Sequence, residues 1–271
     1  MQPLHQRVGA GVVITLLVAA PQTWGQQLPL TAEEKRAFLE SAEVIEAEQT
    51  SKGVTQPWRL TLTNGTLTHA GVFQSVDQQK AKQRLGNTQE FNFVDSYRYN
   101  IAAYELAVLI GLGDMVPVTV ERRWNGKTGA LSWWIDDVMF DEATRQDSGR
   151  RPDDIAAWSA QMGRMVVFEE LVHDNDRNKT NILYTGDWKL YMIDFSRAFR
   201  LWDQLRRPQD LVRIDASLFE RLQSLTNDAV HLALGSILTG GEMDGIMKRR
   251  DRLVQHFEDL IDRKGEALVL N

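Results

Sequence analysis

The order of apolar and polar residues changes character part-way along the chain. Residues 58–76 and 115–136 each hold two alternating segments that flank an Asn-Gly pair, Asn64-Gly65 and Asn125-Gly126. Such a pair between alternating segments predicts a β-hairpin, because its backbone readily takes the tight turn that joins antiparallel strands. Further on, apolar residues recur at helical spacing, which predicts helices over residues 154–172, 218–225, 229–238 and 242–263.

The first half also contains helical patterns. Residues 31–49 begin with Thr31 and Glu34 in capping-box positions and continue with apolar residues at mixed helical spacing, so we predict a helix there. A second helix is predicted over residues 95–112, which have a long apolar face. The polar residues 77–89 are predicted to form a loop or a loosely held helix.

These elements predict an α+β fold with two lobes. The first lobe is mainly β and covers about residues 50–140, and the second is mainly helical and covers about residues 150–271. One short β-rich interval, residues 182–194, interrupts the helices of the second lobe.

The N-terminus resembles an export signal. His5 and Arg7 precede an uncharged run over residues 8–20, which is short for a membrane span and is followed by a possible cleavage zone at residues 23–25. We therefore expect residues 1–25 to be a signal peptide and residues 26–271 to form one exported domain, periplasmic or secreted. The alternative is an uncleaved N-terminal anchor, and only then do we expect membrane contact. The lack of cysteine fits folding without disulfides outside a reducing cytosol.

Net charge narrows the range of partners. The formal charge of −6 argues against a generally basic, nucleic-acid-binding surface. We therefore expect no nucleic acid as a partner.

Chemistry-bearing residues gather around the β-rich interval. Asp176 and Asn181 stand five apart in a polar loop that leads from a helix into a strand, and a second strand ends at Asp194. A hairpin of this kind should bring Asp194 back beside Asn181. Carboxylate and amide oxygens suit Mg²⁺ or Mn²⁺, which take the rest of their ligands from phosphates and water. Asp176 would remain free to orient or deprotonate an attacking hydroxyl. The alternative is a turn rich in Asp and Asn, chosen for local hydrogen bonding.

The same residues resemble a known family. DRNKTNIL, which starts at Asp176, and MIDFS, which contains Asp194, are similar to the catalytic loop and metal-binding motif of phosphatidylinositol 3-/4-kinase-like proteins. This architecture includes the HipA-type serine kinases and the secretory-pathway Golgi casein kinases. Residues 100–117 resemble the helix of the N-lobe in these relatives, and the whole resemblance covers about residues 58–199. It implies a two-lobed atypical protein-kinase-like fold that binds ATP, with Asp176 as the catalytic carboxylate and with Asn181 and Asp194 on the metal.

Two positions depart from the family pattern. Gln74 stands where relatives carry a lysine that pairs with the phosphates, and Asn100 stands where they carry a glutamate. A hydrogen bond between these two amides could replace the ion pair but could not supply positive charge. Lys80 or Lys82 could reach in from the following segment, and Glu105 lies about one and a half turns further along the helix. We therefore take Gln74, Asn100 and Glu105 as the candidate cofactor-binding residues.

The predicted function is a metal-dependent phosphotransferase that moves the γ-phosphate of ATP to a hydroxyl of an unidentified protein or small molecule. The alternative is a degenerate kinase that binds a nucleotide or another phosphorylated ligand without transfer. A third interpretation, a structural envelope protein, leaves the clustered polar residues unexplained.

Arg197 and Arg200 follow Asp194 closely. They could meet a phosphorylated or acidic substrate, or they could pair with Asp203 or Glu220 at the surface.

Overall fold

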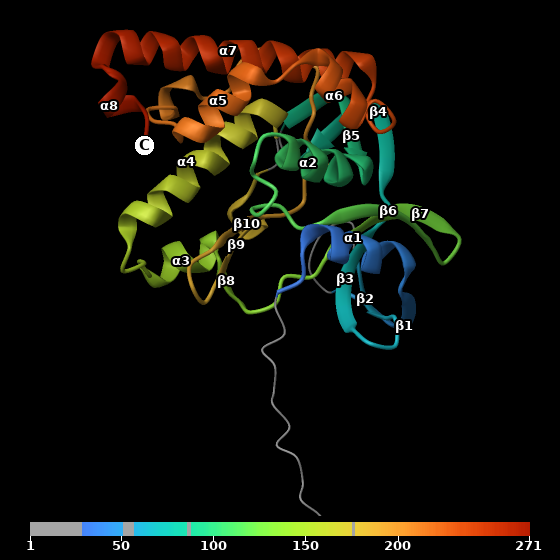
Figure 1. Cartoon of the computed structure of the whole chain (residues 1–271). Helices are drawn as coiled ribbons and strands as arrows, with labels where there is room; N and C mark the ends of the chain where they lie inside the picture. The colour runs from blue at the N-terminus through green and yellow to red at the C-terminus, as the bar shows by residue number, and fades with distance from the viewer. Residues whose placement is uncertain (1–28, 51–56, 86–87, 175–176) are drawn as a thin grey trace, which may run out of the picture. The chain divides into compact units, whose positions relative to one another are not determined.

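A computed structural model describes residues 29–50, 57–85, 88–174 and 177–271 (Figure 1). Residues Thr31–Asn271 form one compact unit. The predicted signal peptide, residues 1–25, and the predicted catalytic residue Asp176 lie outside the described residues. No helix in the described ranges combines the length and the apolarity needed to cross a bilayer.

A five-stranded antiparallel sheet forms the first half, in the order β1-β2-β3-β7-β6. Its strands are β1 (Glu43–Gln49), β2 (Trp58–Thr63), β3 (Thr68–Gln74), β6 (Thr119–Trp124) and β7 (Lys127–Trp133). Both predicted hairpins are confirmed, since β2 pairs with β3 and β6 with β7. The turns need residues that tolerate positive φ, and Gly65 and Gly126 have φ of 86° and 75°.

The helix predicted over residues 31–49 is correct only in its first half. Helix α1 covers Ala32–Ser41 and begins with the expected capping box, in which Thr31 and Glu34 bond each other's backbone N–H groups. The chain then becomes extended and forms β1, whose Val44 pairs with Leu62 of β2. The hydrogen-bond ladder along the sheet edge outweighs the helical preference of a glutamate- and alanine-rich segment.

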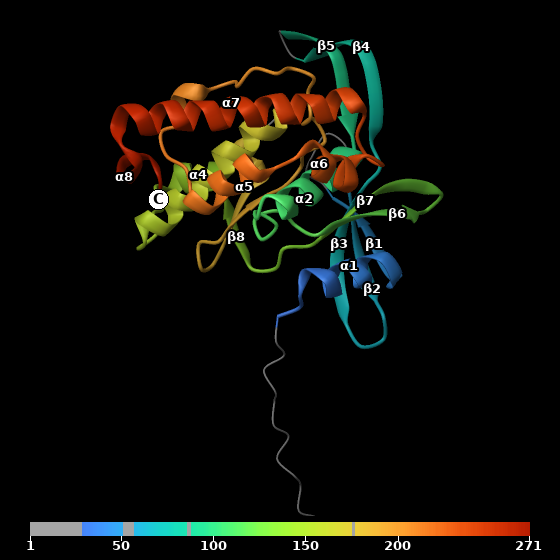
Figure 2. The same cartoon turned by 45° about the horizontal axis from the view of Figure 1, so that its top comes forward.

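The prediction of a loop or loose helix over residues 77–89 is wrong. Strands β4 (Asp77–Leu85) and β5 (Thr88–Ser96) form a separate two-stranded sheet. In Figure 2 this hairpin extends away from the five-stranded sheet. Its strands bury little apolar surface, with Phe93 as the main exception, so the period-two pattern that reveals a strand is weak.

Glu90 anchors this hairpin to the segment that follows Asp194. Its two carboxylate oxygens contact Arg197 and Arg200, each at 2.5 Å. The backbone N–H of Ser96 also donates to the carbonyl of Ser196 at 2.8 Å. A two-stranded hairpin is marginally stable alone, so these contacts explain how it is held.

The two arginines therefore have a partner that the sequence did not suggest. Both contact Glu90, whereas Asp203 pairs with Arg252 at 3.1 Å.

Helices dominate the second half. They are α3 (Glu142–Ser148), α4 (Ile155–Val172), α5 (Ala216–Ser224), α6 (Asn227–Leu234), α7 (Gly240–Lys264) and α8 (Glu266–Val269), with 3₁₀ turns at Lys179–Asn181 and Pro208–Asp210. An earlier helix, α2 (Arg98–Leu109), precedes β6 and contacts β6, β7 and α6. A three-stranded sheet, β10-β9-β8, lies among them and consists of β8 (Val138–Asp141), β9 (Ile182–Thr185) and β10 (Leu190–Met192). The predicted helices are thus present, with their ends shifted by a few residues.

Buried Arg249 ties α7 to the rest of the helical half. Its guanidinium donates to the backbone carbonyls of Leu171, Arg200 and Trp202 at 2.7, 2.9 and 2.5 Å. Burial lowers the pKa of Arg249 to about 10, which leaves it charged at neutral pH.

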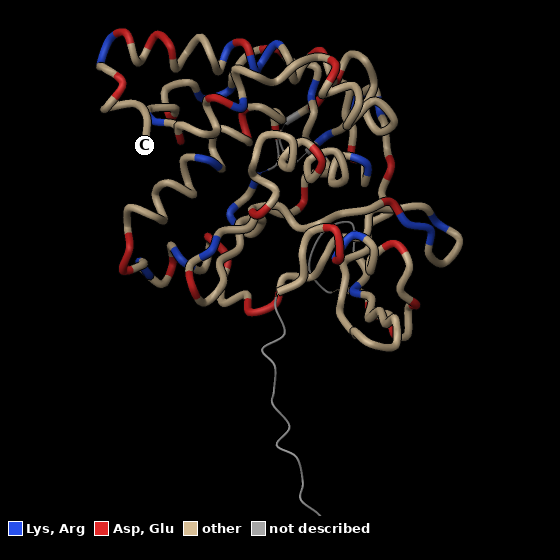
Figure 3. The backbone as a smooth tube through the Cα atoms, in the orientation of Figure 1, with Lys and Arg blue, Asp and Glu red and all other residues tan. Residues whose placement is uncertain are grey.

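Elsewhere acidic and basic residues are interspersed over both the sheet and the helices (Figure 3).

Candidate active site

The β9–β10 hairpin brings Asp194 beside Asn181, as the sequence predicted. Met192 pairs with Ile182, and one step further the N–H of Ile193 donates to the carbonyl of Asn181 at 3.0 Å. Asn181 ends the 3₁₀ turn Lys179–Asn181, whose first residue follows the capping side chain of Asn178. The hairpin ladder therefore fixes the two predicted metal ligands next to each other along the backbone.

Arg177 holds the two ends of this arrangement together. Its Nη1 donates to the carbonyl of Asn181 at 3.2 Å and also to the carbonyl of Ile193. Its guanidinium lies over the ring of Phe195, 4.2 Å from the centroid. One side chain thus contacts the polar loop and both neighbours of Asp194. Sequence reasoning missed it, and its place directly after Asp176 was the one available hint.

Buried carboxylates surround the other side of Arg177. Its Nη2 lies 2.6 Å from Asp174 and its Nε lies 3.6 Å from Glu169, and all three side chains are at most 4% exposed. Burial raises the pKa of Glu169 to about 7, although Arg177 opposes this change. The site therefore rests on a desolvated ion cluster whose charges depend on one another.

Loss of Arg177 should destabilise the whole domain. In Arg177→Met the buried carboxylate of Asp174 loses the guanidinium that lies 2.6 Å away. Glu169 also loses Arg177 and retains Arg207 at 3.4 Å. We expect the free energy of unfolding to fall by about 3–5 kcal/mol. Because the pKa of Glu169 is about 7, the loss should be larger at pH 8 than at pH 5. Urea unfolding measures it, with Arg123→Met on the exposed β6–β7 hairpin as the control, for which about 0.5 kcal/mol or less is expected. A loss below about 1 kcal/mol for Arg177→Met at pH 8 would contradict this account.

Asp194 has the environment of a cation ligand. The residue is half-buried and takes φ of 56°, a left-handed conformation that is uncommon outside glycine. Burial raises the pKa of its carboxyl above the ordinary value, and contacts with Ser196 and Arg177 only partly offset this. A cation bound there would compensate the desolvated charge.

The described residues suit a metal held partly by its substrate. They contain no group of three or more His, Cys, Asp and Glu side chains that could hold an ion by themselves. Asn181 and Asp194 offer two oxygen ligands, and Mg²⁺ usually completes such a set with phosphate oxygens and water. The donor chemistry therefore fits Mg²⁺ or Mn²⁺ together with ATP.

Asn100 connects the five-stranded sheet to the Asp194 segment. Its side-chain amide donates to Gln74 Oε1 at 2.7 Å, and its Oδ1 accepts from the backbone N–H of Phe195, also at 2.7 Å. The Gln–Asn hydrogen bond that was expected in place of an ion pair is therefore present. The second bond was not foreseen, and it couples α2 directly to the residue after Asp194.

The remaining candidates lie elsewhere. The carboxylate of Glu105 pairs with Arg36 of α1 at 2.6 Å. Its role in cofactor binding stays a prediction. Lys80 donates to Gln83 at 3.0 Å, and Lys82 lies over the ring of Phe91, with 5.8 Å to the centroid. Among the described residues, the polar and ring contacts of these three side chains are thus made with groups other than Gln74 and Asn100.

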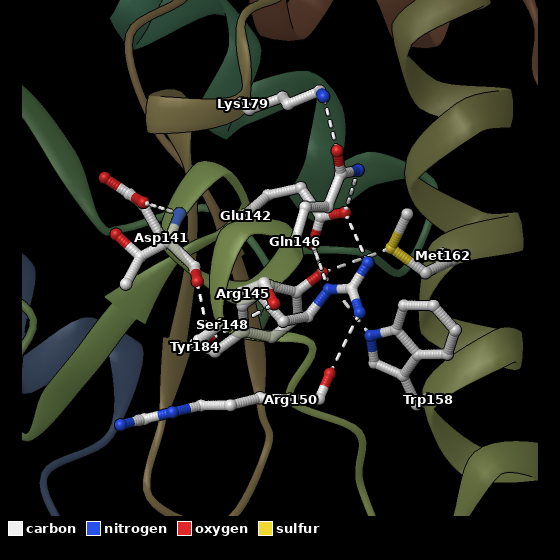
Figure 4. A network of polar contacts seen from close by, with 11 residues as sticks. Asp141, Glu142, Arg145, Gln146, Ser148, Arg150, Trp158, Met162, Lys179 and Tyr184 are labelled. Atoms are coloured by element: carbon white, nitrogen blue, oxygen red, sulfur yellow. Dashed lines mark hydrogen bonds and ion pairs between the residues drawn. The ribbon is translucent and has the colours of Figure 1, made fainter.

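A polar network holds the 3₁₀ turn to α3 (Figure 4). Buried Glu142 accepts from Arg145, from Gln146 at 2.7 Å and from the hydroxyl of Tyr184 at 2.9 Å. Burial alone would raise the pKa of Glu142, but these hydrogen bonds lower it below the usual value. Lys179 donates to Gln146, and this hydrogen bond connects the 3₁₀ turn to α3.

Two hollows in the described structure are lined by other residues. One, of about 770 Å³, lies between the start of α1, the Trp133–Asp137 segment and the β9–β10 turn. The other, of about 1020 Å³, lies between the β4–β5 hairpin and residues 199–202. Neither hollow is lined by the candidate site residues Gln74, Asn100, Asn181 and Asp194. The candidate site is therefore identified from its side chains and their hydrogen bonds, and not from a cavity.

Comparison with known structures shows which fold the chain has. A hydra Fam20 protein solved with sugar matches with a TM-score of 0.67 and 14% identity, over 89% of this chain and 92% of the other. Golgi casein kinase with Mn and ADP bound matches with a TM-score of 0.63 and 13% identity, over 88% and 78%. The chain has an atypical kinase-like fold. The Helicobacter pylori proinflammatory kinase CtkA agrees, with a TM-score of 0.55 and 8% identity over 86% and 99%.

Sequence comparison adds no closer relative. No known protein family matches the chain, and no curated protein is similar to it in sequence. Identities of 8–14% show the fold alone, so the function has to be argued from the site.

Proposed function

We propose that this protein is an exported, metal-dependent phosphotransferase of the phosphatidylinositol-kinase-like type. It moves the γ-phosphate of ATP to a hydroxyl of a protein or a small molecule. The observation that carries the proposal is the hairpin that sets Asp194 beside Asn181 within a kinase-like fold. Export rests on the predicted signal peptide, residues 1–25.

The division of labour follows from the residues. Asn181 and Asp194 hold Mg²⁺ or Mn²⁺, which neutralises charge on the transferring phosphoryl group. Asp176 orients or deprotonates the acceptor hydroxyl. Arg177 and Asn100 act indirectly, since they fix the backbone on either side of Asp194.

A second function is favoured by one specific feature. The Gln74–Asn100 pair is neutral, and relatives carry a lysine where Gln74 stands. The candidate is therefore a degenerate kinase that binds nucleotide, or another phosphorylated ligand, without transferring phosphate. A purely structural role is the remaining alternative from a different class.

Calorimetric titration of ATP into the full-length chain, with Mg²⁺ and then with Mn²⁺, tests the proposal. We expect metal-dependent binding with a dissociation constant of about 1 μM–1 mM, the range common for enzyme substrates. Release or transfer of the labelled γ-phosphate then separates a transferase from a degenerate kinase. Absence of binding with either metal, in a sample shown to be folded by circular dichroism, would contradict every function that uses ATP. It would leave a degenerate kinase for another phosphorylated ligand, or the structural role.

A further inference from the structure

Arg59 lies on the same face of the five-stranded sheet as Gln74. In the β2–β3 ladder Arg59 is directly opposite Val72, and Val72 and Gln74 are two residues apart on β3. Directly opposite residues point to one face, and residues two apart on a strand share a face. Gln74 is therefore a diagonal neighbour of Arg59, about 7–8 Å away, which is within reach of a long side chain.

Burial supports this division of the sheet. Leu60, Leu62 and Phe73 are at most 1% exposed and belong to the opposite face, whereas Arg59 and Gln74 are only half-buried. The Arg59 guanidinium lies 4.9 Å from the ring centroid of Trp134, which follows β7. The face that leads to Asn100 and the Asp194 segment therefore carries a cation.

This cation has no polar partner in the described structure. Arg59 Nε is buried and makes no hydrogen bond there. Glu48 lies opposite Arg59 on β1, yet none of the ion pairs between described residues joins the two. A buried guanidinium nitrogen without an acceptor is costly, and a bound anion would satisfy it.

Other cations around the site are already engaged. Arg177 is paired with buried carboxylates, Lys179 bonds Gln146, and Arg197 and Arg200 share Glu90. Among the described residues of this face, Arg59 is therefore a guanidinium whose contact is an aromatic ring.

We propose that Arg59 is the phosphate-binding cation of this site and takes the part that a lysine at the Gln74 position would play. Its ligand class is a polyphosphate chain, carried by a nucleotide or free. A guanidinium matches phosphate oxygens in a bidentate manner, and the Trp134 ring orients it before the ligand arrives. This inference rests on the proposed function for the location of the ligand, and it explains how a site without the lysine can hold phosphates.

The test titrates sodium tripolyphosphate, ATP and adenosine separately into the full-length chain in the presence of Mg²⁺. Three variants accompany the wild type: Arg59→Gln, the double variant Arg59→Gln/Gln74→Lys, and Arg123→Gln as an exposed control on the same sheet. Arg59→Gln should weaken tripolyphosphate and ATP about tenfold or more and leave adenosine unchanged. The lysine of the double variant should restore affinity to within about threefold of the wild type, and Arg123→Gln should stay within about twofold.

Each contrary result is distinct. If the wild type binds ATP and Arg59→Gln binds tripolyphosphate equally well, the inference on Arg59 fails while the proposed function stands. A loss confined to adenosine would assign Arg59 to the base and would overturn the inference as well. Tripolyphosphate binding that depends on Arg59, without ATP binding, would support the inference and contradict the proposed function. A folded wild type that binds no tripolyphosphate would overturn the inference.

Discussion

Replacement of Asp194 by asparagine should abolish metal-dependent ATP binding and leave the fold intact. The amide has the same shape as the carboxylate but carries no charge, so the metal loses its only anionic protein ligand among the two proposed. The contact from the Ser196 N–H can persist, because the amide oxygen still accepts it. Calorimetric titration of ATP with Mg²⁺ and Mn²⁺ measures the loss, and urea unfolding checks the fold.

A matched control exists in the same hairpin. Asp187 lies exposed in the turn between β9 and β10, and Asp187→Asn should leave metal-dependent ATP binding unchanged. Unaltered metal-dependent binding in Asp194→Asn would remove Asp194 from the metal site.

The pH dependence of metal binding gives a further readout of the same residue. Burial raises the pKa of Asp194, so its carboxyl becomes protonated at a higher pH than an ordinary aspartate, whose pKa is about 3.9. Metal binding needs the ionised form and therefore releases a proton. Metal-dependent ATP affinity of the wild type should decline on acidification before exposed aspartates begin to titrate.

Replacement of Asp176 by asparagine should keep ATP affinity and remove turnover. In the proposed roles Asp176 contacts the acceptor hydroxyl rather than the metal, so its loss affects the chemical step by about 10²–10⁴-fold. Titration of ATP and measurement of phosphate transfer on the same preparations separate affinity from turnover. The Asp187→Asn control should match the wild type in both.

Two results would count against this role. A loss of ATP affinity comparable to the loss of turnover would place Asp176 on the metal or the nucleotide. A wild type that binds ATP but shows no transfer that Asp176→Asn could remove would favour the degenerate kinase.

Local signals explain why much of the fold could be predicted. The turns at Asn64-Gly65 and Asn125-Gly126 and the capping box of Thr31 depend on residues a few positions apart, and each is present. Strand β1 and the β4–β5 hairpin were missed because their stability comes from pairing and anchoring, through β2 and Glu90, rather than from their own apolar pattern. Segment composition carries little information about such contacts.

For the candidate site too, part of the arrangement could be predicted from the sequence and part could not. Asn181 and Asp194 are joined by a short hairpin, so their proximity could be inferred from the spacing of two strands. The bond between Asn100 and the Phe195 N–H spans 95 positions and depends on how α2 packs against the Asp194 segment. Arg177 likewise contacts Glu169, which precedes it, and the carbonyl of Ile193, which follows it, and no sequence spacing predicts that one residue makes both contacts.

The amide pair of Gln74 and Asn100 links β3 to α2 through groups that respond neither to pH nor to salt concentration. A lysine–glutamate pair weakens as salt screens its charges, and it loses one partner when acid protonates the carboxylate. Neither amide gains or loses a proton over the ordinary pH range, and neither carries a charge for salt to screen. The bond to the Phe195 N–H shares this property, so neither protonation nor screening of charge weakens the two bonds that link the sheet to the residue after Asp194.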